Sequence, residues 1–184
     1  SLFERLQDPQ PVMRIDAVTL LSSHGDPQTR RRVLDRMESE ENPDVLRECI
    51  SNLGTSQATE NASQILTFLR HTEPSVRATA VVALMDLEFE ANEALGDLTE
   101  DPSFRVRTRA LAALGRFGNR EAEQKLLSML QSPLEEERIE VVRALDHCPR
   151  DIGYLLRILE SESSIDVQIA AVRSLGRLAN PQAV

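Results

Sequence analysis

The sequence predicts an all-α solenoid, a right-handed α-α superhelix of about six two-helix repeats of ~31 residues each. One apolar motif recurs along the chain, a second apolar pattern with helical spacing lies between its copies, and no strand-like alternation recurs. Only 3% of the residues are aromatic and none is Trp, so the apolar mass comes from Leu, Val, Ile and Ala. That composition favours helix packed on helix.

The recurring motif predicts the second helix of each repeat. Its copies read MRIDAVTLLS, VLRECISNLG, VRATAVVALM, VRTRALAALG, ERIEVVRALD and VQIAAVRSLG, and they begin at positions 13, 45, 76, 106, 137 and 167. Successive copies lie 32, 31, 30, 31 and 30 residues apart, and a leucine follows the central residue four positions later in each. The central small or apolar residues are Ala17, Cys49, Ala80, Ala110, Val141 and Ala171.

The pattern between the copies predicts the first helix of each repeat. Two adjacent apolar residues followed by a third one turn later make a narrow stripe on a helix. The pattern begins at Val33, Ile65, Ala94, Leu126 and Leu155, and Leu2, Phe3 and Leu6 look like the last turns of an earlier first helix. Proline precedes one helix of each pair, at Pro9, Pro43, Pro74, Pro102 and Pro133. Glycine is expected to mark helix ends, at Gly25, Gly54, Gly115, Gly118 and Gly176.

A repeat of this length cannot bury its apolar face alone, so the units are expected to stack into one solenoid. The expected domain is therefore a single one that spans residues 1–184. Both ends resemble interrupted repeats, because NPQAV at the far end reads as the start of another helix. The chain is expected to be a monomer or part of a larger chain.

Charge and composition exclude several classes of function. The formal net charge of −9 repels polyanions, so nucleic acid and anionic membrane are not expected partners. No run of about 18 apolar residues and no signal peptide is present, which predicts no membrane span. The two cysteines lie far apart and lack ligand spacing, as in a reduced cytoplasmic protein.

The copies resemble the HEAT repeat, in the short form found in bacterial proteins and in phycobilisome lyase-type chains. The second helix of that form reads roughly DP, a few residues, VR, A and then ALG, and the stretch DPSFRVRTRALAALG, from Asp101 to Gly115, matches it most closely. The resemblance covers nearly the whole chain. It implies the fold and leaves the chemistry open.

No catalytic or metal-binding constellation is evident, so we expect no enzyme activity and no cofactor. His24, His71 and His147 lie near helix ends without a second ligand, and the His-Glu dipeptides of the HEAT-like deoxyhypusine hydroxylases are missing. Cys49 takes a position otherwise filled by Ala or Val, which predicts a buried, inert thiol. Cys148, in HCPRD, belongs to a turn and is a weak candidate nucleophile without a positioned third group.

Arginine recurs at one position of the repeat. Arg14, Arg77, Arg107 and Arg138 share this column, and Asp8, Glu73 and Asp101 recur in the preceding turns. We interpret the column as a structural ladder of charge-assisted bonds between turns and neighbouring repeats, in preference to a ligand site.

The second helices are expected to line the concave side of the superhelix. The polar face that they present there is acidic in the early repeats, basic in the fourth, mixed in the fifth and basic at the end. We expect this chain to be a non-enzymatic scaffold that binds a protein or peptide, with an acidic segment, on that face. The candidate partner-binding residues are Arg105, Arg109, Arg116, Arg143, Arg173 and Arg177.

Two alternatives stay open. The resemblance to phycobilisome lyase-type chains implies a bilin lyase-like protein that handles a chromophore. The resemblance to HEAT-like DNA glycosylases implies DNA binding, although the acidic balance and the lack of Trp or Tyr on the inner wall oppose it.

Overall fold

The computed structural model describes residues 2–22, 26–56, 58–147 and 152–179 of the chain. These residues form α-helices and short 3-10 helices joined by turns, without a strand among them. They divide into two compact units, unit 1 (residues 1–94) and unit 2 (residues 95–184), each described by itself below. The all-α prediction is confirmed.

The described residues contain the helix pairs that the sequence predicts. The helices are α1 (Leu2–Arg5), α2 (Pro11–Ser22), α3 (Pro27–Ser39), α4 (Pro43–Thr55), α5 (Ala62–Thr67), α6 (Pro74–Asp86), α7 (Asn92–Asp97), α8 (Phe104–Arg116), α9 (Arg120–Ser128), α10 (Glu135–Leu145), α11 (Gly153–Ser161) and α12 (Ile165–Ala179). The 3-10 turns η1 (Thr59–Asn61), η2 (Phe68–Arg70), η3 (Leu98–Glu100) and η4 (Met129–Gln131) extend α5, α7 and α9.

Local sequence explains where several helices begin. Proline is the first residue of α3, α4 and α6, where its fixed φ suits a helix and its missing N–H costs no hydrogen bond. Side chains then cap three helices. Asp26 accepts hydrogen bonds from the backbone of Gln28 and Thr29, Asn42 caps α4 in the same way, and Asn119 accepts one from the Ala122 N–H.

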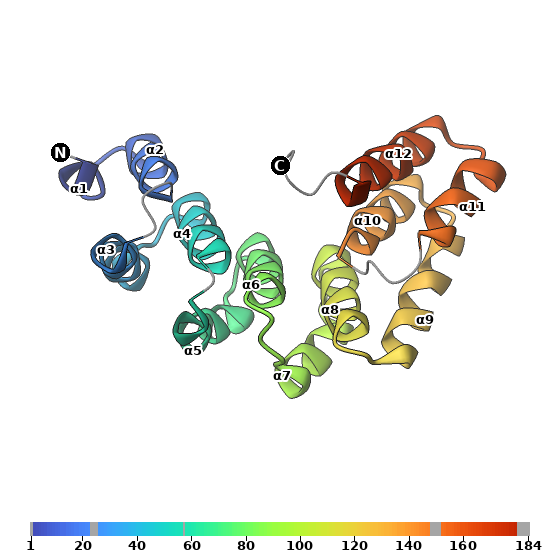
Figure 1. Ribbon diagram of the computed structural model, residues 1–184, viewed down its shortest axis with the longest axis horizontal. Helices are drawn as coiled ribbons and strands as arrows, with labels where there is room; N and C mark the ends of the chain where they lie inside the picture. The colour runs from blue at the N-terminus through green and yellow to red at the C-terminus, as the bar shows by residue number, and fades with distance from the viewer. Residues whose placement is uncertain (1, 23–25, 57, 148–151, 180–184) are drawn as a thin grey trace. The chain divides into compact units, whose positions relative to one another are not determined.

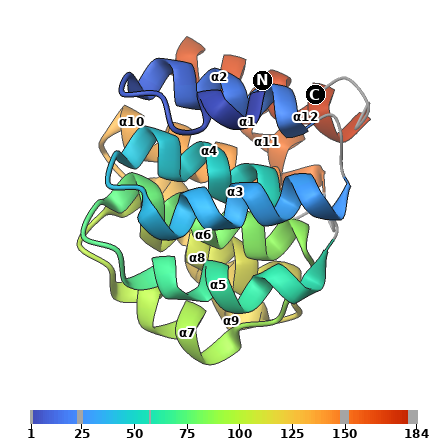
Figure 2. The ribbon, with the colours of Figure 1, turned by 90° about the vertical axis from the view of Figure 1, so that its left-hand side faces the viewer.

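Within each unit the helices form two rows (Figures 1 and 2). In unit 1 the second helices α2, α4 and α6 pack side by side, while α3 and α5 pack on the second helices of their own repeats. In unit 2 the row of second helices is α8, α10 and α12, with α9 against α8 and α11 against α12. This arrangement confirms the predicted repeat of helix pairs.

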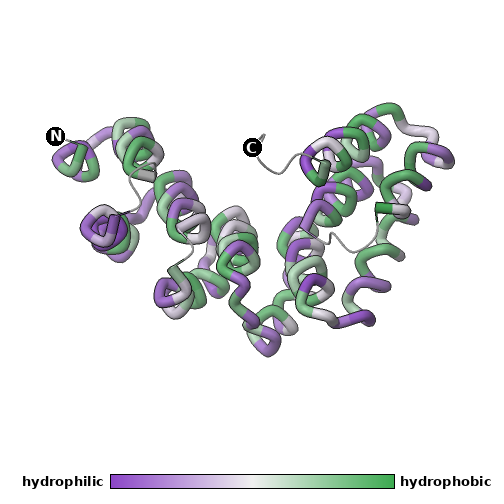
Figure 3. Tube along the Cα trace, in the orientation of Figure 1, coloured by the Kyte–Doolittle hydropathy of each residue, from purple (hydrophilic) through white to green (hydrophobic). Residues whose placement is uncertain are grey.

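The core follows the predicted central column. Hydrophobic and hydrophilic residues alternate along the helices of both units, as Figure 3 shows. The six central residues all have exposures of 0%; they are Ala17, Cys49, Ala80, Ala110, Val141 and Ala171. Small residues are required here because the column lies where each second helix is enclosed by its neighbours.

Enlarging this column should destabilise the protein. Ala110→Leu adds three carbon atoms at a position without exposed surface, and we expect it to lower the free energy of unfolding by about 1–3 kcal/mol through overpacking. Thermal denaturation followed by circular dichroism measures the effect. An unchanged melting midpoint would contradict the assigned repeat register.

Each second helix has two faces inside the row. The backward face contacts the second helix of the preceding repeat, and the forward face contacts that of the following repeat. Asn52, on the backward face of α4, donates from Nδ2 to the Val18 carbonyl of α2 at 3.4 Å. Gly54 lies on the forward face of α4, where an added Cβ would meet Cα and Cβ of Ala83 in α6 at 2.7 Å. This glycine therefore permits close helix approach.

The structure corrects the expectation that every glycine marks a helix end. Gly54 and Gly115 each lie one residue inside the last residue of their helices, and Gly176 lies inside α12. Gly118 does follow a helix end, with φ of 98°. Gly25 lies outside the described residues. At Gly54, the glycine therefore serves the packing of α4 against α6.

The arginine column forms a ladder, with backbone carbonyls as shared acceptors. Arg14 Nη1 donates to the Asp8 carbonyl at 2.7 Å, Arg77 to that of His71 at 2.8 Å, and Arg107 to that of Asp101 at 2.7 Å. The carboxylates of Asp8 and Asp101 accept backbone N–H groups in their own turns. The ladder is confirmed, because each of these guanidinium groups donates to a backbone carbonyl in the turn that follows the first helix.

Glutamates extend the ladder between neighbouring repeats. Arg14 binds Glu40 through two hydrogen bonds of 2.8 and 2.9 Å, and Arg138 binds Glu162 through two of 3.0 and 3.3 Å. Each glutamate precedes a repeat whose own column lacks arginine, with Leu46 and Gln168 in its place. In the sixth repeat, Gln168 still bonds its own turn, because its Nε2 donates to the Glu162 carbonyl at 2.7 Å.

Candidate partner-binding face

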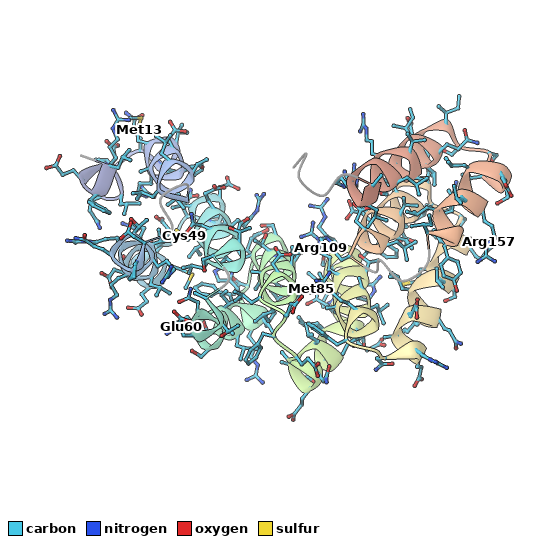
Figure 4. The ribbon with its side chains drawn as sticks, in the orientation of Figure 1. Met13, Cys49, Glu60, Met85, Arg109 and Arg157 are labelled. Atoms are coloured by element: carbon cyan, nitrogen blue, oxygen red, sulfur yellow. The ribbon has the colours of Figure 1, made fainter. Side chains whose placement is uncertain are left out.

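The six predicted arginines all lie on the second helices of unit 2. Arg105, Arg109 and Arg116 belong to α8, Arg143 to α10, and Arg173 and Arg177 to α12. Because α10 packs against both α8 and α12, the structure brings these side chains onto one row of helices, and Figure 4 labels Arg109 within it. We call these six residues the arginine face.

Glu140 neutralises part of the arginine face. Its carboxylate accepts two hydrogen bonds of 3.2 Å from Arg105 and one of 2.9 Å from Arg143. The Glu140 side chain is 17% exposed, whereas those of Arg105 and Arg143 are 51% and 55% exposed. One carboxylate therefore faces two solvated guanidinium groups.

A second cluster surrounds His147. Arg177 of α12 forms an ion pair with Asp146. The pKa of the half-buried His147 lies below its ordinary value of 6.5, because burial disfavours the imidazolium. The negative charge of Asp146 opposes this shift, and the positive charges of Arg109, Arg116 and Arg177 add to it. The imidazole is therefore neutral at pH 7. Arg109, Arg116 and Arg177 thus lie close enough to His147 for their charges to act on it.

Among the other candidate residues, the structure describes the surroundings of Cys49 and His71. Cys49 is fully buried in α4 (Figure 4), and burial raises the pKa of its thiol to about 12, so it stays protonated. His71 Nδ1 accepts a hydrogen bond from the Glu73 N–H at 3.0 Å, which gives it a structural role. Cys148 and His24 lie outside the described residues. Among the residues that the structure describes, no group of three or more His, Cys, Asp or Glu could hold a metal ion.

A groove of about 710 Å³ lies elsewhere in unit 2, between η4 and α11. Its lining includes Arg138 and Glu162, which bind one another, and Tyr154, whose ring lies 4.6 Å from the guanidinium carbon of Arg157. The sequence did not single out this groove. The ion pair of Arg138 and Glu162 links α10 to the end of α11 along this groove.

Comparison with known proteins agrees with the repeat geometry. A family model of HEAT repeats matches residues 1–85 and 62–146, and this chain belongs to the HEAT-repeat family. It is similar in fold to the complex of CpcE and CpcF of phycocyanin lyase from Nostoc sp. PCC7120, with a TM-score of 0.69 at 17% identity over 96% of this chain and 75% of the other.

Another solved structure is a designed armadillo repeat protein in complex with the peptide (KR)4, at a TM-score of 0.47 and 18% identity, covering 96% of this chain and 98% of the other. No curated protein matches the sequence. Within the described residues, no helix is both long and apolar enough to cross a bilayer.

Proposed function

We propose that this chain is a non-enzymatic scaffold that binds an acidic segment of a partner protein on the arginine face of unit 2. The observation that carries the proposal is the gathering of arginines there. Six arginines of α8, α10 and α12 share one row of helices, and the side chains of Arg105 and Arg143 stay 51% and 55% exposed while they pair with Glu140. Extended surfaces of this kind are what repeat solenoids offer to partners.

Arginine suits a carboxylate ligand for a physical reason. Its planar guanidinium pairs with a carboxylate through two parallel hydrogen bonds and loses less hydration than an ammonium group does. Arg105 already shows this geometry with Glu140, at 3.2 Å for both bonds. A partner's glutamate or aspartate side chains would extend the same pairing along the row.

The proposal predicts a specific loss of binding. A fluorescein-labelled peptide rich in Glu should bind the wild-type protein at low salt. A triple variant, in which Glu replaces each of Arg105, Arg109 and Arg116, should bind the peptide at least about tenfold more weakly. Fluorescence anisotropy measures the dissociation constant. The melting midpoint of each protein is measured beside the dissociation constant, so that a loss of binding is distinguished from a loss of folding.

A matched control separates the patch from overall charge. Arg31, Arg32 and Arg120 are exposed and lie outside the arginine face, so their replacement with Glu makes the same change in net charge. Equal weakening by both triple variants would reject the arginine face. Absorbance spectra recorded after mixing the protein with free bilin test the alternative of a chromophore-handling protein.

A further inference from the structure

The groove between η4 and α11 has a counterpart in unit 1. Each groove is lined by an arginine of the column, by the glutamate bound to that arginine, and by a glutamine seven residues before the arginine. These residues are Arg138, Glu162 and Gln131 in unit 2, and Arg14, Glu40 and Gln7 in unit 1. The groove volumes are about 710 Å³ in unit 2 and about 580 Å³ in unit 1. The two grooves therefore occupy the same place in the repeat.

Unit 1 fills its groove with an arginine of its own. Arg36 lies one turn before Glu40, and its side chain is 12% exposed. Its Nη1 donates to Gln7 Oε1 at 3.2 Å, and its Nε lies 3.0 Å from the Glu40 carboxylate. Asp8 and Glu41 add two more carboxylates to the lining. This groove is therefore occupied from within, and its carboxylates repel an acidic ligand.

Unit 2 has different chemistry at the same positions. Ile158 takes the position of Arg36, and its side chain has no hydrogen bond to donate to Gln131. The two additional carboxylates of the unit 1 lining are replaced by the hydroxyl groups of Ser132 and Ser163. The unit 2 groove thus keeps the pair of arginine and glutamate, but it has neither the internal arginine nor the additional negative charges.

Arg157 adds a positive charge to the unit 2 groove. It lies on α11, where Figure 4 labels it, and its guanidinium carbon lies 4.6 Å from the ring centroid of Tyr154. This contact holds the exposed guanidinium group beside the groove. Glu162 already accepts hydrogen bonds of 3.0 and 3.3 Å from Arg138. The charged residues of the described lining are these two arginines and one glutamate, so the groove is complementary to one negative charge.

Arg138 has further donors for such a charge. A guanidinium group carries five N–H groups. In Arg138, one on Nε and one on Nη2 donate to Glu162, and one on Nη1 donates to the Ser132 carbonyl at 2.9 Å. One N–H group remains on each of Nη1 and Nη2. A carboxylate in the groove would therefore find donors on Arg138 as well as on Arg157.

The apolar part of the lining sets a second feature of the ligand. Leu127 and Leu130 come from α9 and η4, and Tyr154 and Ile158 come from α11, so an apolar side chain can contact both elements. The Glu162 carboxylate opposes a ligand with several negative charges. The groove therefore favours a single carboxylate next to an apolar side chain. The last residue of a peptide chain provides both when that residue is apolar.

We propose that this groove binds the free C-terminus of a partner protein whose last residue is apolar. The terminal carboxylate pairs with Arg157 and Arg138, and the last side chain packs between Leu130 and Tyr154. The side-chain amide of Gln131, which is both a donor and an acceptor, pairs with the peptide backbone. The groove shares no residue with the arginine face, so this inference does not rest on the proposed function.

Tyr154 gives a signal that is specific to the groove, because the chain has a single Tyr and no Trp. The probe is an acetylated peptide that ends in two leucines and a free carboxylate and contains no aromatic or charged side chain. It should change the fluorescence of Tyr154 saturably, with a dissociation constant between about 10 µM and about 1 mM. The same peptide with a C-terminal amide should bind at least about tenfold more weakly.

Two variants test the assigned residues. Arg157→Ala should weaken binding of the free-acid peptide at least about tenfold, with the Tyr154 signal retained. Ile158→Arg should abolish binding, because the new guanidinium group would fill the groove as Arg36 does in unit 1. Melting midpoints show whether each variant is folded. Arg157 is exposed, so Arg157→Ala decides the question even if Ile158→Arg does not fold.

Arg120→Ala is the matched control, since Arg120 is exposed on α9 and does not line the groove. It should bind the free-acid peptide as the wild type does. The proposal is overturned if the wild type shows no saturable change up to about 10 mM peptide. Equal binding of the acid and the amide, or equal affinities of Arg157→Ala and Arg120→Ala, overturns it as well. So does a folded Ile158→Arg protein that binds as the wild type does.

Discussion

Arg14→Leu is expected to lower the free energy of unfolding by about 2–4 kcal/mol at pH 7, because it leaves a buried carboxylate with one partner fewer. The Glu40 side chain is only 2% exposed, and Arg36 is its other ion-pair partner. Leucine itself fits this column, since Leu46 occupies it in the next repeat with 2% exposure. The loss therefore combines the ion pair with the hydrogen bonds from Arg14 to the Asp8 and Pro9 carbonyls, and chemical denaturation measures it.

The same pair predicts a pH dependence. Burial alone would raise the pKa of Glu40, but the hydrogen bonds from Arg14 and the Asn42 N–H and the charges of Arg36 and Arg14 bring it below its ordinary value. A carboxyl whose pKa is lowered by folding stabilises the protein above the unfolded-state pKa and loses that contribution as the pH falls through the folded-state pKa. The difference in the free energy of unfolding between wild type and Arg14→Leu should be largest at pH 7 and should shrink below about pH 4.

Arg47→Leu is the control for this variant. Arg47 and Asp44 form an ion pair at 2.9 Å with side chains 46% and 65% exposed, so its loss should cost less than about 1 kcal/mol. Adding Glu40→Gln to Arg14→Leu should recover part of the stability, because the unpaired charge is removed. Equal effects of Arg14→Leu and Arg47→Leu would contradict the buried ladder.

Gly54→Ala is expected to destabilise the protein by about 2–3 kcal/mol, although alanine favours helix by roughly 1 kcal/mol over glycine. The new Cβ would lie 2.7 Å from Cα and Cβ of Ala83, so α4 and α6 must separate. Gly176 occupies the same position of the last repeat, and a Cβ added there would meet no atom within 4 Å. Gly176→Ala should therefore raise the free energy of unfolding by about 0.5–1 kcal/mol. The melting midpoints of both variants, measured at micromolar protein concentration, compare the two effects.

Opposite signs for the two alanine variants are the decisive result. If Gly54→Ala were as stable as Gly176→Ala, the close contact between α4 and α6 would not exist in solution. If both variants were destabilised equally, the cause would be the replacement of a glycine within its own helix and not a contact with the neighbouring repeat.

The repeat register could be read from the sequence because it depends on local chemistry. The central column from Ala17 to Ala171 and the prolines at helix starts mark every second helix, and helical periodicity is a property of neighbouring residues. The role of Gly54 was harder to predict. A glycine that ends a helix and one that admits a neighbouring helix look alike until Ala83 is placed beside it.

The contacts of the arginine column were predicted only in part. Glu40 and Glu162 lie 26 and 24 residues from their arginines, and no local pattern links such distant residues. A signal was nonetheless present, because both glutamates precede the two repeats that lack the column arginine. On the arginine face, charge could be read from the sequence, but the sharing of Glu140 by Arg105 and Arg143 required the packing of α10 beside α8.

Capture of partners from native lysate tests most directly whether the arginine face binds a protein. Three proteins are immobilised once their melting midpoints are shown to agree. They are the wild type, the variant with Glu at Arg105, Arg109 and Arg116, and the control variant with Glu at Arg31, Arg32 and Arg120. We expect wild type and control to retain a common set of proteins with acidic segments, and the arginine-face variant to lose that set. An identical set of proteins on all three would contradict a function for the arginine face.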